Sequence, residues 1–238
     1  MKWAWAAVIA VIVAAAGIFV FRTVNAPDTG GVVVQTVQPT REPVPTTTTT
    51  TTASAFADPN PDQPTEVVDV VAVDRAGNPA AGYEVSDGGE VMSCHGSSAG
   101  ILGCSPTAAG ADVCWVTPTP RVLLCGTAPW EKSLRKVTAG EVDQKPLGEE
   151  AQPWGLELAD GAKCQRRNGG SWPGRSDGLA GAYFCDREHE FVLAGDGPLV
   201  NRTKPPWTVR IGDLGESNAS FPPPADMRVV TAYFAASS

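Results

Sequence analysis

One stretch decides the fold class: Trp-Gly-Leu-Glu-Leu-Ala-Asp-Gly-Ala-Lys-Cys-Gln, residues 154–165. From Trp154 to Leu158 the residues alternate as they do in a half-buried strand. Asp160-Gly161 then supplies the pair that a tight hairpin turn prefers, and Lys163–Gln165 begins a second strand. The sequence therefore predicts a β-hairpin here.

Further strands follow on both sides of this hairpin. A β-branched run covers 67–73, and 113–116 and 122–125 flank a Thr/Pro turn and predict a second hairpin. Strand patterns recur at 182–185, 191–193, 207–211 and 229–234. We expect a turn at Asp87-Gly88-Gly89, and only 130–139 has the character of a short helix. Many short strands with Gly/Pro turns predict a mainly β fold, an antiparallel sandwich or barrel.

The cysteines predict that this fold is stapled. All six lie in the C-terminal part of the chain: Cys94, Cys104, Cys114, Cys125, Cys164 and Cys185. An even number in an exported segment is typical of a disulfide framework, for which six cysteines allow 15 pairings. We expect neighbours to pair, as Cys94–Cys104, Cys114–Cys125 and Cys164–Cys185. A zinc site is the weaker alternative, because no two cysteines have the close spacing of zinc ligands, and we predict no metal.

The N-terminus predicts a membrane anchor. An uncharged, apolar run extends from Trp3 to Phe21, and about 20 such residues in a helix cross the ~30 Å core of a bilayer. A cleaved signal peptide is the alternative, with Val24-Asn25-Ala26 as its cleavage site. Pro27 would hinder that cut, so we predict that residues 1–21 are a cytoplasmic stub and a single transmembrane helix that stays in place.

A Pro/Thr-rich segment separates this anchor from the cysteines. Residues 22–65 contain recurrent prolines and an unbroken threonine run from Thr46 to Thr52. Such a composition buries too little apolar surface to offset the entropy of ordering, so we expect a disordered stalk. The predicted organisation is thus an anchor, a stalk, and an extracytoplasmic disulfide-rich β domain at 66–238.

Composition and motifs exclude several functions. The chain has 18 Lys+Arg against 26 Asp+Glu and a net charge of −8, which disfavours a nucleic-acid partner. It contains no nucleophile elbow, zinc-protease or phosphate-loop motif, and we predict no cofactor. His95 and His189 are the only histidines. We interpret both as members of ordinary polar loops, although His95 has serines nearby and Asp87 upstream, as a hydrolase would need.

A glycine-rich loop at 167–175 is the preferred binding site. It holds Asn168, Trp172 and Arg175, which combine an aromatic ring with hydrogen-bonding groups, and long loops of this kind frequently carry binding residues. We expect these three residues to bind a ligand by stacking on a sugar ring or a partner's side chain. The alternative is that Trp172 folds back to cover the core.

Several stretches resemble a known group of proteins. They are 112–115, 124–125, 129–130, 153–164, 167–172, 206–209 and 231–234. Together they look like uncharacterised membrane-anchored envelope proteins of mycobacteria and related actinobacteria. The resemblance covers most of the β domain but not the stalk. It implies the cell envelope as the compartment, and it implies no activity and no site residue.

These observations predict a membrane-tethered, extracytoplasmic binding or adaptor module. Its expected partners are the membrane, through the N-terminal helix, and a cell-wall polysaccharide or an envelope protein. We expect no catalysis. The alternatives are an envelope hydrolase around His95 or His189 and a small inhibitor domain that presents the Cys94–Cys104 loop. A binding module predicts exposed aromatic residues on a flat face, a hydrolase a deep polar pocket, and an inhibitor a protruding rigid loop.

Overall fold

The computed structural model describes residues 56–238, except 99, 106–109, 147, 149, 168–171, 189 and 217. The predicted anchor at 1–21 and most of the predicted stalk lie outside the described residues. The described part of the chain forms twelve strands, and it holds no helix of the length and hydropathy that a membrane crossing requires. The prediction of a mainly β fold is confirmed.

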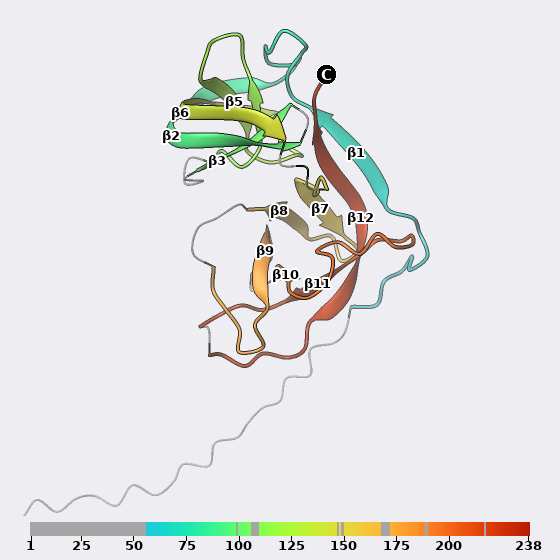
Figure 1. The fold of residues 1–238 in the computed structure, drawn as a ribbon. Coiled ribbons are helices and arrows are strands. Elements are labelled where there is room, and N and C mark those ends of the chain that lie inside the picture. Colours follow the sequence, from blue (N-terminus) through green and yellow to red (C-terminus); the bar gives the residue numbers. More distant parts are fainter. Residues whose placement is uncertain are drawn as a thin grey trace, which may run out of the picture. The chain divides into compact units, whose positions relative to one another are not determined.

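Five strands close into a barrel (Figure 1, green to yellow). They are β2 (Glu84–Ser98), β3 (Ile101–Ser105), β4 (Cys114–Val116), β5 (Val122–Gly126) and β6 (Ser133–Pro146). Successive strands pair antiparallel, and the long strands β2 and β6 pair in parallel and close the ring. The interior holds four half-cystines with Leu102, Leu123 and Val137.

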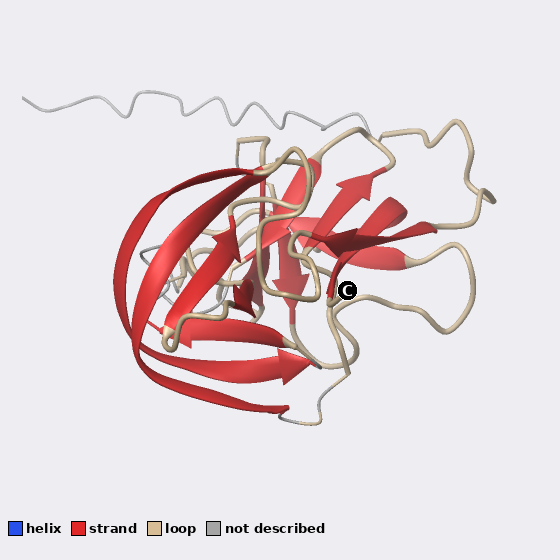
Figure 2. Ribbon diagram, turned by 90° about the horizontal axis from the view of Figure 1, so that it is seen from above, coloured by secondary structure: helices blue, strands red, loops and turns tan. Residues whose placement is uncertain are grey.

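The other seven strands form a second sheet in the order β1-β12-β11-β10-β9-β8-β7. They are β1 (Glu66–Val71), β7 (Gly155–Leu158), β8 (Lys163–Arg166), β9 (Ala180–Cys185), β10 (Phe191–Ala194), β11 (Thr208–Gly212) and β12 (Ala225–Ala236). The long strand β12 pairs with β11 and also with β7, so this sheet closes on itself as well. Figure 2 shows the strands of both sheets curving around their interiors. A separate core, which includes Leu156, Tyr183 and Val229, fills the second sheet.

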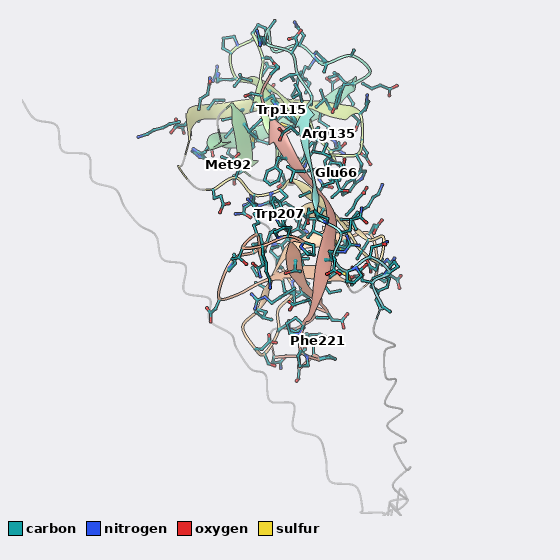
Figure 3. The ribbon with its side chains drawn as sticks, turned by 90° about the vertical axis from the view of Figure 1, so that its right-hand side faces the viewer. Glu66, Met92, Trp115, Arg135, Trp207 and Phe221 are labelled. Atoms are coloured by element: carbon teal, nitrogen blue, oxygen red, sulfur yellow. A yellow bond between two sulfur atoms is a disulfide. The ribbon has the colours of Figure 1, made fainter. Side chains whose placement is uncertain are left out.

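A third apolar cluster joins the two sheets. Trp115 of β4 and Trp154 at the start of β7 are both buried in it. The Trp115 indole Nε1 donates a hydrogen bond of 2.9 Å to the carbonyl of Ala236, near the end of β12. In Figure 3, Trp115 lies beside the upper end of β12, in the barrel, and Phe221 marks the opposite end of the molecule. The two sheets therefore share buried side chains, and a hydrogen bond links the barrel to β12 of the second sheet.

Three disulfides join Cys94–Cys104, Cys114–Cys125 and Cys164–Cys185. In each bridge the two cysteines lie directly opposite each other on antiparallel strands. The expectation that neighbours pair is confirmed. Each bridge staples one hairpin, because residues that face one another across two strands are the ones close enough to link.

Two local predictions were wrong. The predicted helix at 130–139 is not formed: residues 133–139 belong to β6, since pairing with both β2 and β5 outweighs a weak helical pattern. Asp87-Gly88-Gly89 is not a turn, because β2 continues through it with a register shift, and Gly89 there has a φ of +86°. The predicted antiparallel barrel is confirmed, and two of the strand pairs, β2–β6 and β1–β12, are parallel.

The folded unit also begins before the predicted boundary at Glu66. The Asp58 carboxylate accepts hydrogen bonds of 2.6 and 3.0 Å from the Arg228 guanidinium of β12. Thr65 donates to the carbonyl of Val229 and accepts from the backbone N–H of Trp207. Composition predicted that residues 56–65 belong to the stalk. Side-chain hydrogen bonds of Asp58 and Thr65 instead hold this segment against the second sheet.

Candidate binding surface

The strand registers of the second sheet place six residues in one row across its outer face. From β12 through β7, β8, β9 and β10 to β11, the residues that face one another are Tyr233, Gly155, Gln165, Phe184, Phe191 and Gly212. Since neighbouring side chains along a strand point to opposite faces, all members of such a row share one side of the sheet. This row is the framework of the site.

Phe184 is the most exposed aromatic residue of the row. It stands between Tyr183 and Cys185, which are buried inside the sheet, and it is 55% exposed. Its ring meets that of Phe191 edge to face, with centroids 5.7 Å apart. A large apolar side chain held in this position by its own strand adds nothing to the core, and exposed apolar patches commonly mark interaction surfaces.

Trp172 lies beside this row, over β9. Its ring lies 6.3 Å from that of Phe191, edge to face, and the Arg167 guanidinium stands 5.6 Å above it. The ring also lies against Gly181 of β9, where an added Cβ would overlap it. Trp172 is half-buried. The ring therefore covers the sheet beside Phe191, and its role in binding a ligand stays a prediction.

Trp130 fills the gap that Gly155 leaves at the other end. A Cβ on Gly155 would come within 2.8 Å of the Trp130 ring, which meets the Tyr233 ring edge to face at 6.1 Å. Lys163 lies 5.6 Å above Trp130 and pairs with Glu157 at 3.4 Å. Burial, with a hydrogen bond to Glu157, raises the pKa of Tyr233 to about 12. We call Tyr233, Trp130, Phe184, Phe191 and Trp172 the aromatic belt.

Arg175 takes a different position from the one expected of a ligand-binding residue. It is 4% exposed, and its guanidinium donates to the Asp177 carboxylate and to the carbonyls of Asp213 and Pro222. The hydrogen bond between the Arg175 guanidinium and the Asp177 carboxylate raises the pKa of Arg175 and lowers that of Asp177. Arg175 thus ties the loop that carries Trp172 to the loop between β11 and β12.

The predicted site is therefore only partly assembled. Trp172 is half-buried, Arg175 is buried as a fastening residue, and Asn168 is outside the described residues. Sequence reasoning missed Phe184, Phe191 and Trp130. The alternation in Tyr183-Phe184-Cys185 carried a signal for Phe184, because a cysteine bridged to the next strand faces inward and its neighbour must face outward.

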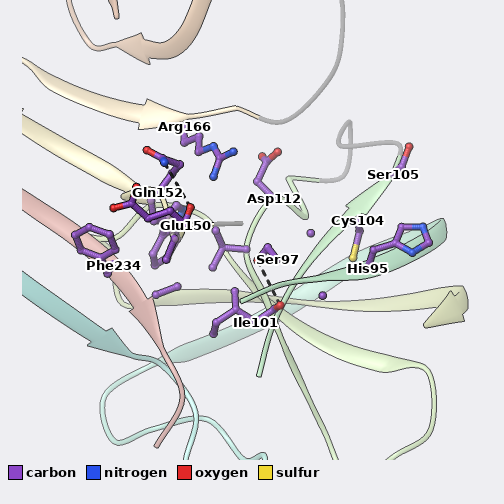
Figure 4. Close-up of a pocket in the computed structure, with 16 residues that line it drawn as sticks. His95, Ser97, Ile101, Cys104, Ser105, Asp112, Glu150, Gln152, Arg166 and Phe234 are labelled. Carbon is purple, nitrogen blue, oxygen red and sulfur yellow. Dashed lines mark hydrogen bonds between the residues drawn. The ribbon is translucent and has the colours of Figure 1, made fainter. Parts of the chain in front are cut away.

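A cavity of about 270 Å³ lies between the barrel and the second sheet (Figure 4). His95, Ser97 and Cys104 line it from β2 and β3, and Arg166 and Phe234 line it from the second sheet. The Ser97 hydroxyl donates to the carbonyl of Ile101. Asp87 lies at the opposite end of β2 from His95, is almost fully exposed, and pairs with Lys136. The grouping of His95 with Asp87 is not formed, and His189 lies outside the described residues.

The sulfurs of Cys104, Cys114 and Cys125 lie within 4.8 Å of one another. Such a group has the spacing of a metal site. All three sulfurs are bonded in disulfides, and zinc is bound by the thiolate form of cysteine. The oxidised protein therefore does not offer these sulfurs as ligands.

Comparison with known proteins gives no match to a protein family, to a curated protein or to a solved structure.

Proposed function

We propose that this chain is a membrane-tethered, extracytoplasmic binding module whose aromatic belt contacts a cell-wall polysaccharide. The observation that carries the proposal is the row of registered residues around the outer side of the closed second sheet, with Phe184 and Phe191 in the row and Trp172 and Trp130 packed beside it. A rigid sheet that holds several aromatic rings on one face is suited to a partner that is itself long and repetitive.

The composition of the belt favours a sugar polymer. A sugar ring presents C–H groups on its faces and hydroxyls at its rim, so it needs aromatic surface with hydrogen-bonding groups beside it. Gln165, Lys163 and Arg167 stand beside the belt. Strands lie about 4.8 Å apart, so the belt follows an arc of roughly 20 Å over five strands of the closed sheet, which is enough for several sugar units.

The disulfides support an extracytoplasmic location for the domain. All six cysteines are paired, and such bridges persist on the oxidising side of a membrane rather than in the cytosol. The apolar run at 3–21 and the Pro/Thr-rich segment that follows fit a tether that carries this module away from the lipid. The location of the domain in the cell envelope is part of the proposal.

A hydrolase is the second candidate, because His95 lines the cavity between the two sheets. That cavity, at about 270 Å³, is slightly below the ~300–1,000 Å³ of usual small-molecule sites. The Ser97 hydroxyl is already bonded to a carbonyl. The inhibitor alternative has less support still, since Cys94 and Cys104 are buried in the barrel rather than at the base of a free loop.

Co-sedimentation tests the proposal. The full chain, oxidised and held in mild detergent, is mixed with washed actinobacterial cell walls before and after protease treatment of the walls. Retention on protein-free walls supports a polysaccharide partner. Retention that disappears with the wall proteins identifies a protein partner and overturns the polysaccharide assignment. Absence of retention on both preparations overturns the binding module and favours the hydrolase.

A further inference from the structure

Two of the three disulfides touch each other. The Cys104 sulfur of the Cys94–Cys104 bridge lies 3.6 Å from the Cys114 sulfur of the Cys114–Cys125 bridge. Neither sulfur carries a proton, so this is a van der Waals contact rather than a hydrogen bond. Cys125 belongs to the same group, since its sulfur lies within 4.8 Å of both.

The barrel fixes this contact. Cys94 faces Cys104 across β2 and β3, Cys114 faces Cys125 across β4 and β5, and β3 pairs with β4. Closure of the five strands turns all four side chains into one small interior, where Leu102, Leu123 and Val137 surround them. The two bridges are neighbours because of the strand order, and packed side chains hold them in place.

One of the four barrel cysteines can be reached by a small molecule from solvent. Cys104 lines the cavity between the two sheets (Figure 4) and is 4% exposed. Cys94, Cys114 and Cys125 are fully buried. The cavity of about 270 Å³ has the volume of roughly nine waters at ~30 Å³ each. A small thiol therefore has room to approach Cys104, whereas the other three sulfurs are shielded.

We propose that the four barrel cysteines form one thiol–disulfide exchange site that accepts electrons from a small dithiol. A donor thiolate attacks the Cys104 sulfur, the S–S bond to Cys94 breaks, and Cys94 leaves as a thiolate that takes a proton. The second donor thiol attacks the mixed disulfide, so the donor is oxidised to its cyclic disulfide and Cys104 becomes a thiolate. The donor has then lost two electrons and two protons.

The second step needs no further electrons. The Cys104 thiolate attacks the Cys114 sulfur in contact with it, and a Cys104–Cys114 bond forms. The Cys114–Cys125 bond breaks, its electron pair goes to Cys125, and Cys125 takes up a proton. The barrel then carries one bridge, between β3 and β4, in place of two hairpin staples. The Cys164–Cys185 bridge, in the other sheet, takes no part.

Limited reduction tests this exchange directly. The full chain in its oxidised form is treated with less than one equivalent of dithiothreitol, quenched with acid and alkylated, and its bridges are mapped by peptide mass spectrometry. The expected product has a Cys104–Cys114 link, alkyl groups on Cys94 and Cys125, and an intact Cys164–Cys185 bridge. A product alkylated on Cys94 and Cys104 that keeps Cys114–Cys125 would overturn the proposal. So would equal reduction of all three bridges.

A pair of variants gives a second, reductant-free test. Cys94→Ser leaves Cys104 as a free thiol beside the intact Cys114–Cys125 bridge, and we expect alkylation to divide between Cys104 and Cys125. Cys164→Ser is the matched control, since Cys185 then has no second bridge beside it and should be the sole alkylated residue. Alkylation of Cys104 alone in Cys94→Ser contradicts the exchange. If this variant fails to fold, limited reduction of the unchanged protein decides.

Discussion

Trp115 and Trp154 meet edge to face, with ring centroids 5.9 Å apart and ring planes inclined by 71°. Trp115 belongs to the barrel and Trp154 opens the first hairpin of the second sheet. Both rings are buried, and the backbone of Gly126 lies against the Trp154 ring where any Cβ would overlap it. The two sheets are therefore joined by shared core rather than by a linker, and we expect them to unfold together.

Replacement of Trp154 tests this coupling. Trp154→Ala removes the ring that links both cores and should lower the free energy of unfolding by about 3–5 kcal/mol. Chemical denaturation followed by circular dichroism measures the change. Met92→Ala is the control, because Met92 is 77% exposed on the barrel and should change stability by about 0.5 kcal/mol or less. Two separate transitions in the unchanged protein would contradict a shared core.

Gly126→Ala tests the same junction by adding a methyl group to it instead of removing a ring. A methyl group at this position has no space beside the Trp154 ring, and overpacking of a core typically costs about 1–3 kcal/mol. We expect a lower midpoint in urea with unchanged secondary structure. A variant as stable as the unchanged protein would mean that the ring moves aside without cost.

Acid should loosen the segment at 56–65. The hydrogen bond from Arg228 lowers the pKa of Asp58 below its usual 3.8. A carboxyl whose pKa is depressed by folding stabilises the protein above its unfolded value and loses that contribution as the pH falls through the folded value. Stability should therefore fall below about pH 4, and Asp58→Asn should make this dependence shallower.

The measurement is urea unfolding at a series of pH values between neutral pH and strong acid. Asp62→Asn, an exposed change of the same chemistry four residues away, serves as the control and should leave the slope of stability with pH close to that of the unchanged protein. Equal slopes in Asp58→Asn and the unchanged protein would show that the Asp58–Arg228 pair does not stabilise the fold.

Gly181→Ala tests whether the position of the Trp172 ring on β9 matters for binding. A Cβ there overlaps the Trp172 ring, so the ring must tilt away from β9 and from its contact with Phe191. We expect red-shifted tryptophan emission and weaker retention on cell walls. Red-shifted emission together with unchanged retention would show that the position of Trp172 on the sheet does not matter for binding.

The sequence was most informative where neighbouring residues decide the structure. The hairpin at 154–165 and the three bridges between facing cysteines depend on turn residues and alternation, which are local. The strand β6 and the bulge at Gly89 depend on partners far along the chain. The prediction for Arg175 did not anticipate Asp213 and Pro222, which lie 38 and 47 residues further along the chain and accept hydrogen bonds from its guanidinium.

The aromatic belt also combines a residue that local sequence predicts with residues that only long-range pairing brings together. Trp172 was noticed because it stands in a glycine-rich loop, but Phe184 and Phe191 come together only through the β9–β10 register. Trp130 reaches the second sheet from the connection between β5 and β6 of the barrel, and it packs over Gly155. No spacing in the chain relates these residues, since the closed sheet alone brings them into one row.

Comparison of Phe184→Ala with Met92→Ala on protein-free cell walls tests the central claim most directly. Both residues are exposed and apolar, so both variants should fold, but only Phe184 belongs to the belt. If the belt binds the wall polysaccharide, Phe184→Ala should weaken retention on the order of tenfold, equivalent to about 1.4 kcal/mol, while Met92→Ala binds as the unchanged protein does. Equal retention of all three proteins would contradict the assignment of the belt as the binding surface.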